Sequence, residues 1–98
     1  MIELHVTFAN AVDAARMARA ALKACANIVD GVRSLYWWQG AIEEEDETLA
    51  IFKTSEAKAD ALEALIAEHH PYDTPAIIRH TAVTANQDYA RWVEKETA

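Results

Sequence analysis

The sequence predicts an α+β fold: a ferredoxin-like βαββαβ unit with an antiparallel sheet, helices on one face and a short C-terminal helix. Apolar and polar residues alternate over residues 2–8, which is the pattern of a half-buried strand. Two segments with helical spacing, 11–24 and 56–69, are each followed by β-branched or aromatic residues. Because 98 residues suffice for one core, we expect a single domain over residues 1–98.

A strand and a helix open the chain. The strand places its apolar residues on one face: Ile2, Leu4, Val6 and Phe8. Asn10 is positioned to cap the helix over 11–24, because a short polar side chain accepts hydrogen bonds from the first turn. The spacing predicts an inner stripe of mostly small residues that would let the helix lie close to the sheet: Val12, Ala15, Ala18 or Arg19, and Leu22.

A long β-ribbon is expected next. Residues 25–29 have strand composition and are interrupted by Asp30-Gly31, which predicts either a hairpin turn or a bulge inside one long strand. Residues 32–39 and 42–54 have the pattern of two further strands that meet at Gln39-Gly40. Both are long compared with the usual strand of about 5–6 residues.

The rest of the chain predicts a helix, a strand and a last short helix. Ser55 precedes the helix over 56–69, which Pro71 ends because the residue before a proline disfavours the helical conformation. The inner positions of this helix are Ala59, Leu62, Leu65, Ile66 and His69. Residues 76–84 are rich in β-branched side chains and predict a fourth strand. Asn86 begins the last helix, which carries Tyr89, Trp92 and Val93 on one face.

The composition excludes several classes of protein. A formal net charge of −7 argues against nucleic-acid binding, which requires clustered Lys and Arg. No segment approaches the roughly 20 apolar residues of a membrane span, and we expect neither a signal peptide nor a membrane partner. Cys25 is the only cysteine, which suits a reducing cytoplasm. Gly31 and Gly40 are the only glycines, so no phosphate-binding P-loop is present.

Aromatic side chains lie on both faces of the expected ribbon. Tyr36 and Trp38 point to one face and Trp37 to the other, because side chains alternate along a strand. Helices can cover only one face, and burial of a Trp is worth roughly 3 kcal/mol or more. We therefore expect copies of the chain to cover the ribbon. The alternative is that the C-terminal helix folds over the open face of the sheet through Tyr89 and Trp92.

Four stretches, in order and at matching spacing, resemble the CutA divalent-cation-tolerance proteins. They are CANI at 25–28, SLYWWQG at 34–40, ETLAIFKT at 47–54 and HPYDTP at 70–75. The resemblance implies a ferredoxin-like protomer in a tight homotrimer, in which long hairpins wrap neighbouring subunits. It also implies a cytoplasmic bacterial protein linked to tolerance of copper and other divalent cations, without catalysis and without a required cofactor.

The resemblance carries over a metal site only in part. The copper ligands proposed in the family fall here on Val6, His69 and Ala76, and only His69 has a donor atom. Any binding of copper or another divalent cation through His69 is therefore expected to be weak. Cys25 is a second candidate ligand, since a thiolate suits copper. The alternatives are structural: a hydrogen-bonded His69 on the inner helix face, and Cys25 as a small core residue.

A second hypothesis is a sensor that binds a small anionic ligand in a cleft between subunits. The expected lining is Tyr36, Trp38, Glu47, Lys53, His69 and Tyr72. Aromatic walls with a cation suit such a ligand, and the trimeric PII signalling proteins bind ligands in comparable clefts, which is an analogy of fold alone. Glu47 and Lys53 would share one strand face and pair across subunits.

Two other hypotheses use the remaining polar residues. The acidic run over 43–47 is either a hard-cation site or the solvated start of a strand. A small ferredoxin-like enzyme would need His5, His80 and Tyr72, but no catalytic motif orders these residues.

Overall fold

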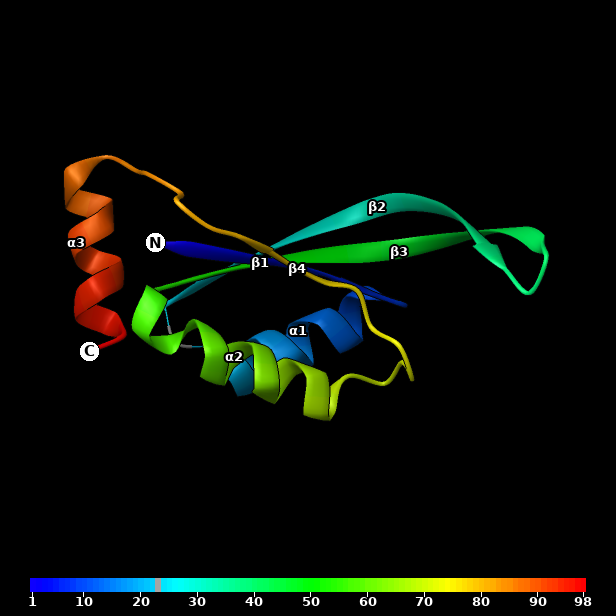
Figure 1. Cartoon of the computed structure of the whole chain (residues 1–98), viewed down its shortest axis with the longest axis horizontal. Coiled ribbons are helices and arrows are strands. Elements are labelled where there is room, and N and C mark those ends of the chain that lie inside the picture. The colour runs from blue at the N-terminus through cyan, green and yellow to red at the C-terminus, as the bar shows by residue number, and fades with distance from the viewer. Residues whose placement is uncertain (23) are drawn as a thin grey trace.

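The computed structural model describes residues 1–22 and 24–98, which form four strands and three helices (Figure 1). In chain order these are β1 (Ile2–Phe8), α1 (Ala11–Ala21), β2 (Cys25–Trp38), β3 (Ala41–Thr54), α2 (Glu56–His69), β4 (Ile77–His80) and α3 (Gln87–Glu96). The strands pair antiparallel in the order β2-β3-β1-β4. This is the ferredoxin-like arrangement that the sequence predicts.

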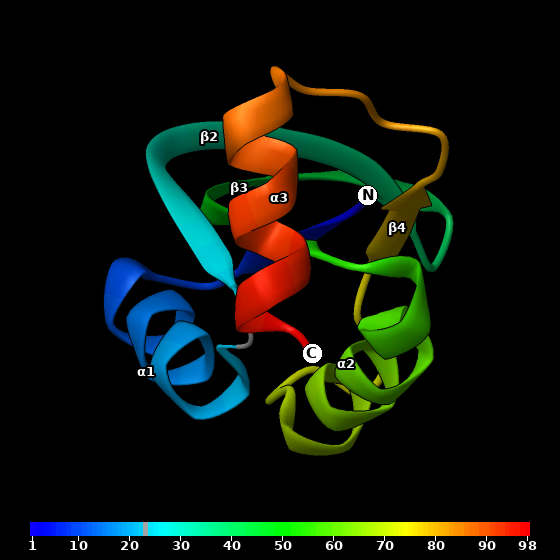
Figure 2. The same cartoon turned by 90° about the vertical axis from the view of Figure 1, so that its left-hand side faces the viewer.

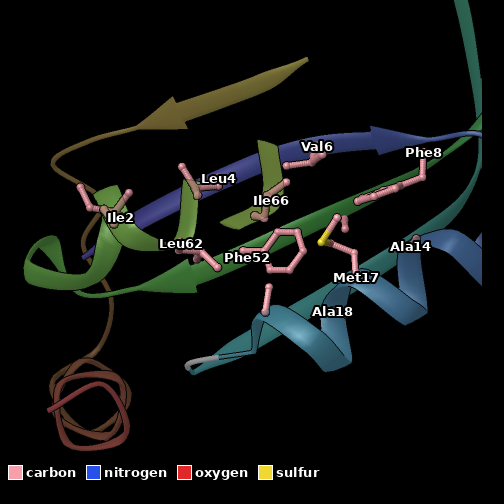
Figure 3. Close-up of a cluster of buried hydrophobic side chains, with 13 residues drawn as sticks. Ile2, Leu4, Val6, Phe8, Ala14, Met17, Ala18, Phe52, Leu62 and Ile66 are labelled. Carbon is pink, nitrogen blue, oxygen red and sulfur yellow. The ribbon is translucent and has the colours of Figure 1, made fainter. Parts of the chain in front are cut away.

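Two of the helices form a second layer on one face of the sheet. α1 and α2 lie side by side below it, and α3 stands across the end of the sheet (Figure 2). The core fills the space between the layers (Figure 3). β1 contributes every second residue to it, as expected from its alternating pattern. The core residues are Ile2, Leu4, Val6, Phe8, Ala14, Met17, Ala18, Ala21, Ala50, Phe52, Ala59, Leu62 and Ile66.

The buried face and the end of α1 differ from the prediction. Val12 is 66% exposed and Leu22 is 50% exposed, and the core side is instead formed by Ala14, Met17, Ala18 and Ala21. Alanine occupies so many positions of this segment that an apolar stripe fits several faces, and Met17 decides between them. The helix ends at Ala21 because Leu22 is extended, and residue 23, expected to be helical, lies outside the described residues.

β2 and β3 form one continuous ribbon with an irregularity at Asp30-Gly31. The register shifts between Val29 and Val32, so this dipeptide is a bulge and the hairpin alternative is wrong. Gly31 has a φ of +76°, a conformation that favours glycine. At the tip, Gln39 and Gly40 both have positive φ, which matches the twist of a tight hairpin. The ribbon extends well beyond the helices (Figure 1).

β4 is shorter than its composition predicts. It spans Ile77–His80 rather than residues 76–84. Its partner in the sheet is β1, and His80 is already opposite Glu3 near the start of that strand. Further along, Ala82 has a φ of +56°, which strand geometry does not accept. The length of β4 is therefore set by β1, not by its own β-branched residues.

Replacing Met17 tests the corrected face of α1. We expect Met17→Ala to lower the free energy of unfolding by about 2–5 kcal/mol, because it leaves a cavity against the sheet. Val12→Ala, on the face that the sequence pattern favoured, should change it by no more than about 0.5 kcal/mol. Urea denaturation at equal protein concentration measures both. A larger loss in Val12→Ala than in Met17→Ala would contradict this assignment.

Candidate functional site

The six side chains expected to line a cleft do not all come together within one chain. Glu47 and Lys53 share a face of β3, but six residues of strand separate their Cα atoms by about 20 Å. Trp38 lies at the far end of the ribbon, opposite Ala41. His69 is exposed at the end of α2. One chain thus does not form the cleft, and a cleft between subunits stays a prediction.

Three of the six residues do gather where the ribbon leaves the body of the protein. The Tyr72 hydroxyl donates a hydrogen bond to Glu47 Oε2 at 2.9 Å, and Glu47 is only 9% exposed. Burial, this hydrogen bond and the negative charges of Glu47 and Glu45 together raise the pKa of Tyr72 well above its usual range. Tyr36 lies next to them, and partial burial followed by Glu45 raises its pKa as well.

His70 positions this cluster, a structural role that the sequence pattern did not predict for it. Its side chain is buried (8% exposed) and stacks on Phe8, with ring centroids 4.5 Å apart. Nε2 lies 2.8 Å from the Thr7 carbonyl oxygen, and Nδ1 accepts a hydrogen bond from the Tyr72 backbone N–H at 3.1 Å. Nδ1 is therefore the acceptor and Nε2–H the donor of a neutral imidazole. His70 thereby attaches the loop after α2 to β1 and directs Tyr72 toward Glu47.

His69 does not take the inner-face role expected of it. Its side chain is exposed, and Nδ1 lies 3.1 Å from the Leu65 carbonyl oxygen. It borders a shallow pocket between α1 and α2 that is also lined by Asp13, Arg16, Met17, Ala20 and Pro71. His70, rather than His69, is the buried histidine because the helix ends between them. His70 is the C-cap residue, and its extended backbone turns its side chain to the sheet.

Cys25 and His69 lie at opposite ends of the helix layer. Cys25 pairs with Lys53, just before α2 begins, whereas His69 is the last residue of α2, about 20 Å along its axis. These two candidate ligands cannot bind one ion within a chain. Among the residues that the structure describes, no three His, Cys, Asp or Glu side chains stand ready to hold a metal ion.

A second cluster joins β2, β3 and α3. Lys53 Nζ donates to Asn27 Oδ1 at 2.7 Å and lies 5.6 Å from the centre of the Tyr89 ring. A hydrogen bond with the Cys25 side chain, followed by burial, raises the pKa of Tyr89 to about 12. Cys25 is only partly buried, and its Sγ lies 3.9 Å from Asn27 Oδ1. α3 is thus held at the end of the sheet opposite the hairpin.

The outer half of the ribbon carries the largest exposed apolar residues. We call Leu35, Trp37, Trp38 and Ile42 the ribbon surface; Trp37 is 73% exposed. α3 does not cover it, because α3 packs at the other end of the sheet (Figure 1). The alternative, in which the C-terminal helix folds over the open face of the sheet, holds only at the end of the sheet, where Tyr89 lies over Lys53, and the ribbon surface stays exposed. Across the described part of the chain, no helix has the length and apolar character needed to cross a membrane.

Comparison with known proteins identifies one family. Residues 2–96 match the family described as CutA1 divalent ion tolerance protein. A Pyrococcus horikoshii protein named divalent-cation tolerance protein CutA is 43% identical over 101 residues, covering 99% of this chain and 98% of that protein. An Escherichia coli protein of the same name is 36% identical over 80 residues, covering 82% of this chain and 71% of that protein. The crystal structure of CutA1 from P. horikoshii superposes with a TM-score of 0.92 at 42% identity, over 100% of this chain and 99% of that chain.

Replacing Tyr72 tests its hydrogen bond to Glu47. Tyr72→Phe leaves a nearly buried carboxylate without its donor, and we expect a loss of about 1–3 kcal/mol in the free energy of unfolding at pH 8. The raised pKa means that the folded protein holds the phenol proton more tightly than the unfolded chain. The contribution of Tyr72 is therefore complete below about pH 10 and is lost as the pH rises through the raised pKa.

Urea denaturation at pH 8 and pH 11 measures this difference. The gap in stability between wild type and Tyr72→Phe should narrow at the higher pH. Tyr36→Phe is the matched control, because Tyr36 is more exposed and its loss should cost no more than about 0.5 kcal/mol. A gap that stays constant between the two pH values would show that Tyr72 acts through packing alone.

Proposed function

Because the chain belongs to the CutA1 divalent ion tolerance family, we propose that it is a homotrimeric, cytoplasmic protein of divalent-cation tolerance. The match over residues 2–96 carries this proposal. The names of the relatives from P. horikoshii and E. coli describe tolerance to divalent cations and mention no reaction. The proposed role is accordingly non-catalytic and requires no cofactor. A lone, partly buried Cys25 thiol suits a reducing compartment and supports the cytoplasmic location.

The shape of the ribbon supports the homotrimer. Beyond the helix layer both of its faces are bare, and the ribbon surface leaves two indole rings largely in water. β2 is also an edge strand, with backbone groups available for pairing along its outer side. If each ribbon packs on the next subunit, three copies close a ring in which every ribbon surface is buried.

The donor atoms near His69 support weak binding of copper or another divalent cation. His69 is exposed and its Nδ1 lies against the Leu65 carbonyl, which leaves Nε2 for a metal ion. The other two family positions contribute nothing, since Val6 is a core residue and Ala76 has no donor. A single imidazole per chain holds an ion loosely unless symmetry copies add to it.

We do not extend the proposal to a sensor of anionic ligands. Lys53, the cation expected to meet such a ligand, is engaged with Asn27 and Tyr89. It also lies about 20 Å along β3 from the Glu47–Tyr72 pair. Within one chain, the cation and the Tyr72 aromatic wall that such a ligand would need are thus far apart.

Light scattering tests the homotrimer. We expect the mass in solution to be three times 10.9 kDa. The double variant Leu35→Ser, Trp37→Ser removes apolar contact area from the ribbon surface and should dissociate at micromolar concentration. Val12→Ser is the matched control, because Val12 is similarly exposed but lies on α1. A folded wild-type chain with the mass of one subunit would refute the assembly.

Titration with Cu²⁺ followed by NMR tests the His69 site. We expect paramagnetic broadening of resonances around His69 only at high micromolar to millimolar Cu²⁺, because one imidazole binds weakly. His69→Gln should remove this broadening while leaving the fold unchanged, since the side chain is exposed. Submicromolar affinity at His69 would contradict the proposed weak site.

A further inference from the structure

The polar cluster at the base of the ribbon holds two carboxylates without a cation. Glu47 and Glu45 lie two residues apart on one face of β3, so their Cα atoms are about 7 Å apart. Tyr72 donates to the first, and Tyr36, opposite Glu43, lies on the same face. In the described part of the chain, the ion pairs all use other carboxylates. The cluster therefore has two negative charges that none of these ion pairs balances.

Burial makes the missing cation important at Glu47. This residue is only 9% exposed, and contact with another molecule can only lower that fraction. The Tyr72 hydroxyl satisfies Oε2, whereas Oε1 has no hydrogen-bond partner among the described residues. Oε1 is still reachable, because the one fully buried side-chain oxygen or nitrogen without a partner in these residues is Thr54 Oγ1. A nearly buried carboxylate with one open oxygen is strongly stabilised by a positive group beside it.

The two phenols favour a cation rather than an anion at this place. Burial, followed by the nearby carboxylates, raises the pKa of both Tyr36 and Tyr72, so both rings stay neutral in a negative local potential. The face of a neutral aromatic ring attracts a cation. This reverses the sign of the ligand that the sequence suggested for these residues. A metal ion fits poorly, since no three ligating side chains of the described residues are grouped to hold one.

We propose that an arginine side chain of a second copy of this chain completes the cluster, with its guanidinium against Glu47 and Glu45. A guanidinium donates several hydrogen bonds from one plane and stacks on aromatic rings, which matches two carboxylates beside two phenols. The inference rests on the proposed homotrimer and deepens it. It assigns the positive group that assembly brings to the base of the ribbon.

Arg33 is the first candidate for that arginine. Its side chain is 70% exposed, and it lies on the ribbon two residues before Leu35, on the same face. That face also carries Trp37, and the proposed assembly buries it against the next subunit, so Arg33 reaches the neighbour together with it. The ion pair of Arg33 with Glu44, at 3.5 Å, is exposed and contributes little. The guanidinium is therefore available to a stronger partner.

Dilution of the homotrimer, followed by light scattering, tests the inference. Glu47→Gln keeps an acceptor for Tyr72 but removes the charge, and should raise the dissociation concentration by roughly tenfold or more. Glu43→Gln, the same change at an exposed position of β3, is the matched control and should leave that concentration unchanged. Arg33→Gln should weaken assembly as much as Glu47→Gln, and the double variant no more than either.

The same substitution in a separated chain should not destabilise folding. In the Leu35→Ser, Trp37→Ser background no second copy supplies an arginine, so Glu47→Gln removes an uncompensated charge. The urea midpoint should then stay unchanged or rise. A lower midpoint would show that Glu47 is stabilised by its own chain and would overturn the proposal.

The outcomes separate this inference from the proposed function. A folded wild-type chain with the mass of one subunit refutes the homotrimer and the inference with it, whereas a Glu47→Gln homotrimer as stable as wild type refutes the inference alone. If Arg33 does not couple to Glu47, the same cycles identify the partner among the other exposed arginines, Arg16, Arg19 and Arg91. Additive effects for all four would overturn the proposal. A polyamine retained by the wild-type assembly in native mass spectrometry would assign the site to a small cation and would also overturn it.

Discussion

The pairing of β1 with β3 sets the positions of the other elements. It runs from Ile2 opposite Thr54 to Phe8 opposite Thr48, and β1 then ends. β3 continues for seven more residues, which have only β2 beside them. The mismatch in length between a 7-residue and a 14-residue strand is thus the origin of the protruding ribbon. Within the paired part, alternation directs one side of β1 into the core and Glu3 and His5 to the opposite face.

The end of β1 is also where the polar cluster forms. Once β1 stops, Glu47 is the first residue of β3 without a β1 neighbour, and the loop after α2 fills that place. His70 holds the loop to the Thr7 carbonyl, and Tyr72 reaches Glu47. The cluster thereby joins the loop after α2 to the sheet at the base of the protruding ribbon.

Sequence reasoning succeeded where a pattern had one solution. The alternation in β1 and the glycine-containing turn at Gln39-Gly40 each fit a single geometry, and the structure confirms both. It failed where the composition fitted several arrangements, or where a neighbouring strand determined the length of an element. Alanines in α1 allow several inner faces, and β4 stops where β1 offers no further partner. Among the site residues, Glu47 and Lys53 share a strand face as expected, but six residues separate them by about 20 Å along β3, so each has a different partner in the chain.

The bulge at Asp30-Gly31 has a consequence for recognition. It places one extra residue in β2, so that Val29 is opposite Leu49 but Val32, not Gly31, is opposite Glu47. Without that offset the outer half of β2 would slip by one position, and each of its side chains would change faces. Trp37 would then occupy the side now held by its two aromatic neighbours, Tyr36 and Trp38. The bulge at this single dipeptide thus determines which aromatic side chains lie on each face of the ribbon.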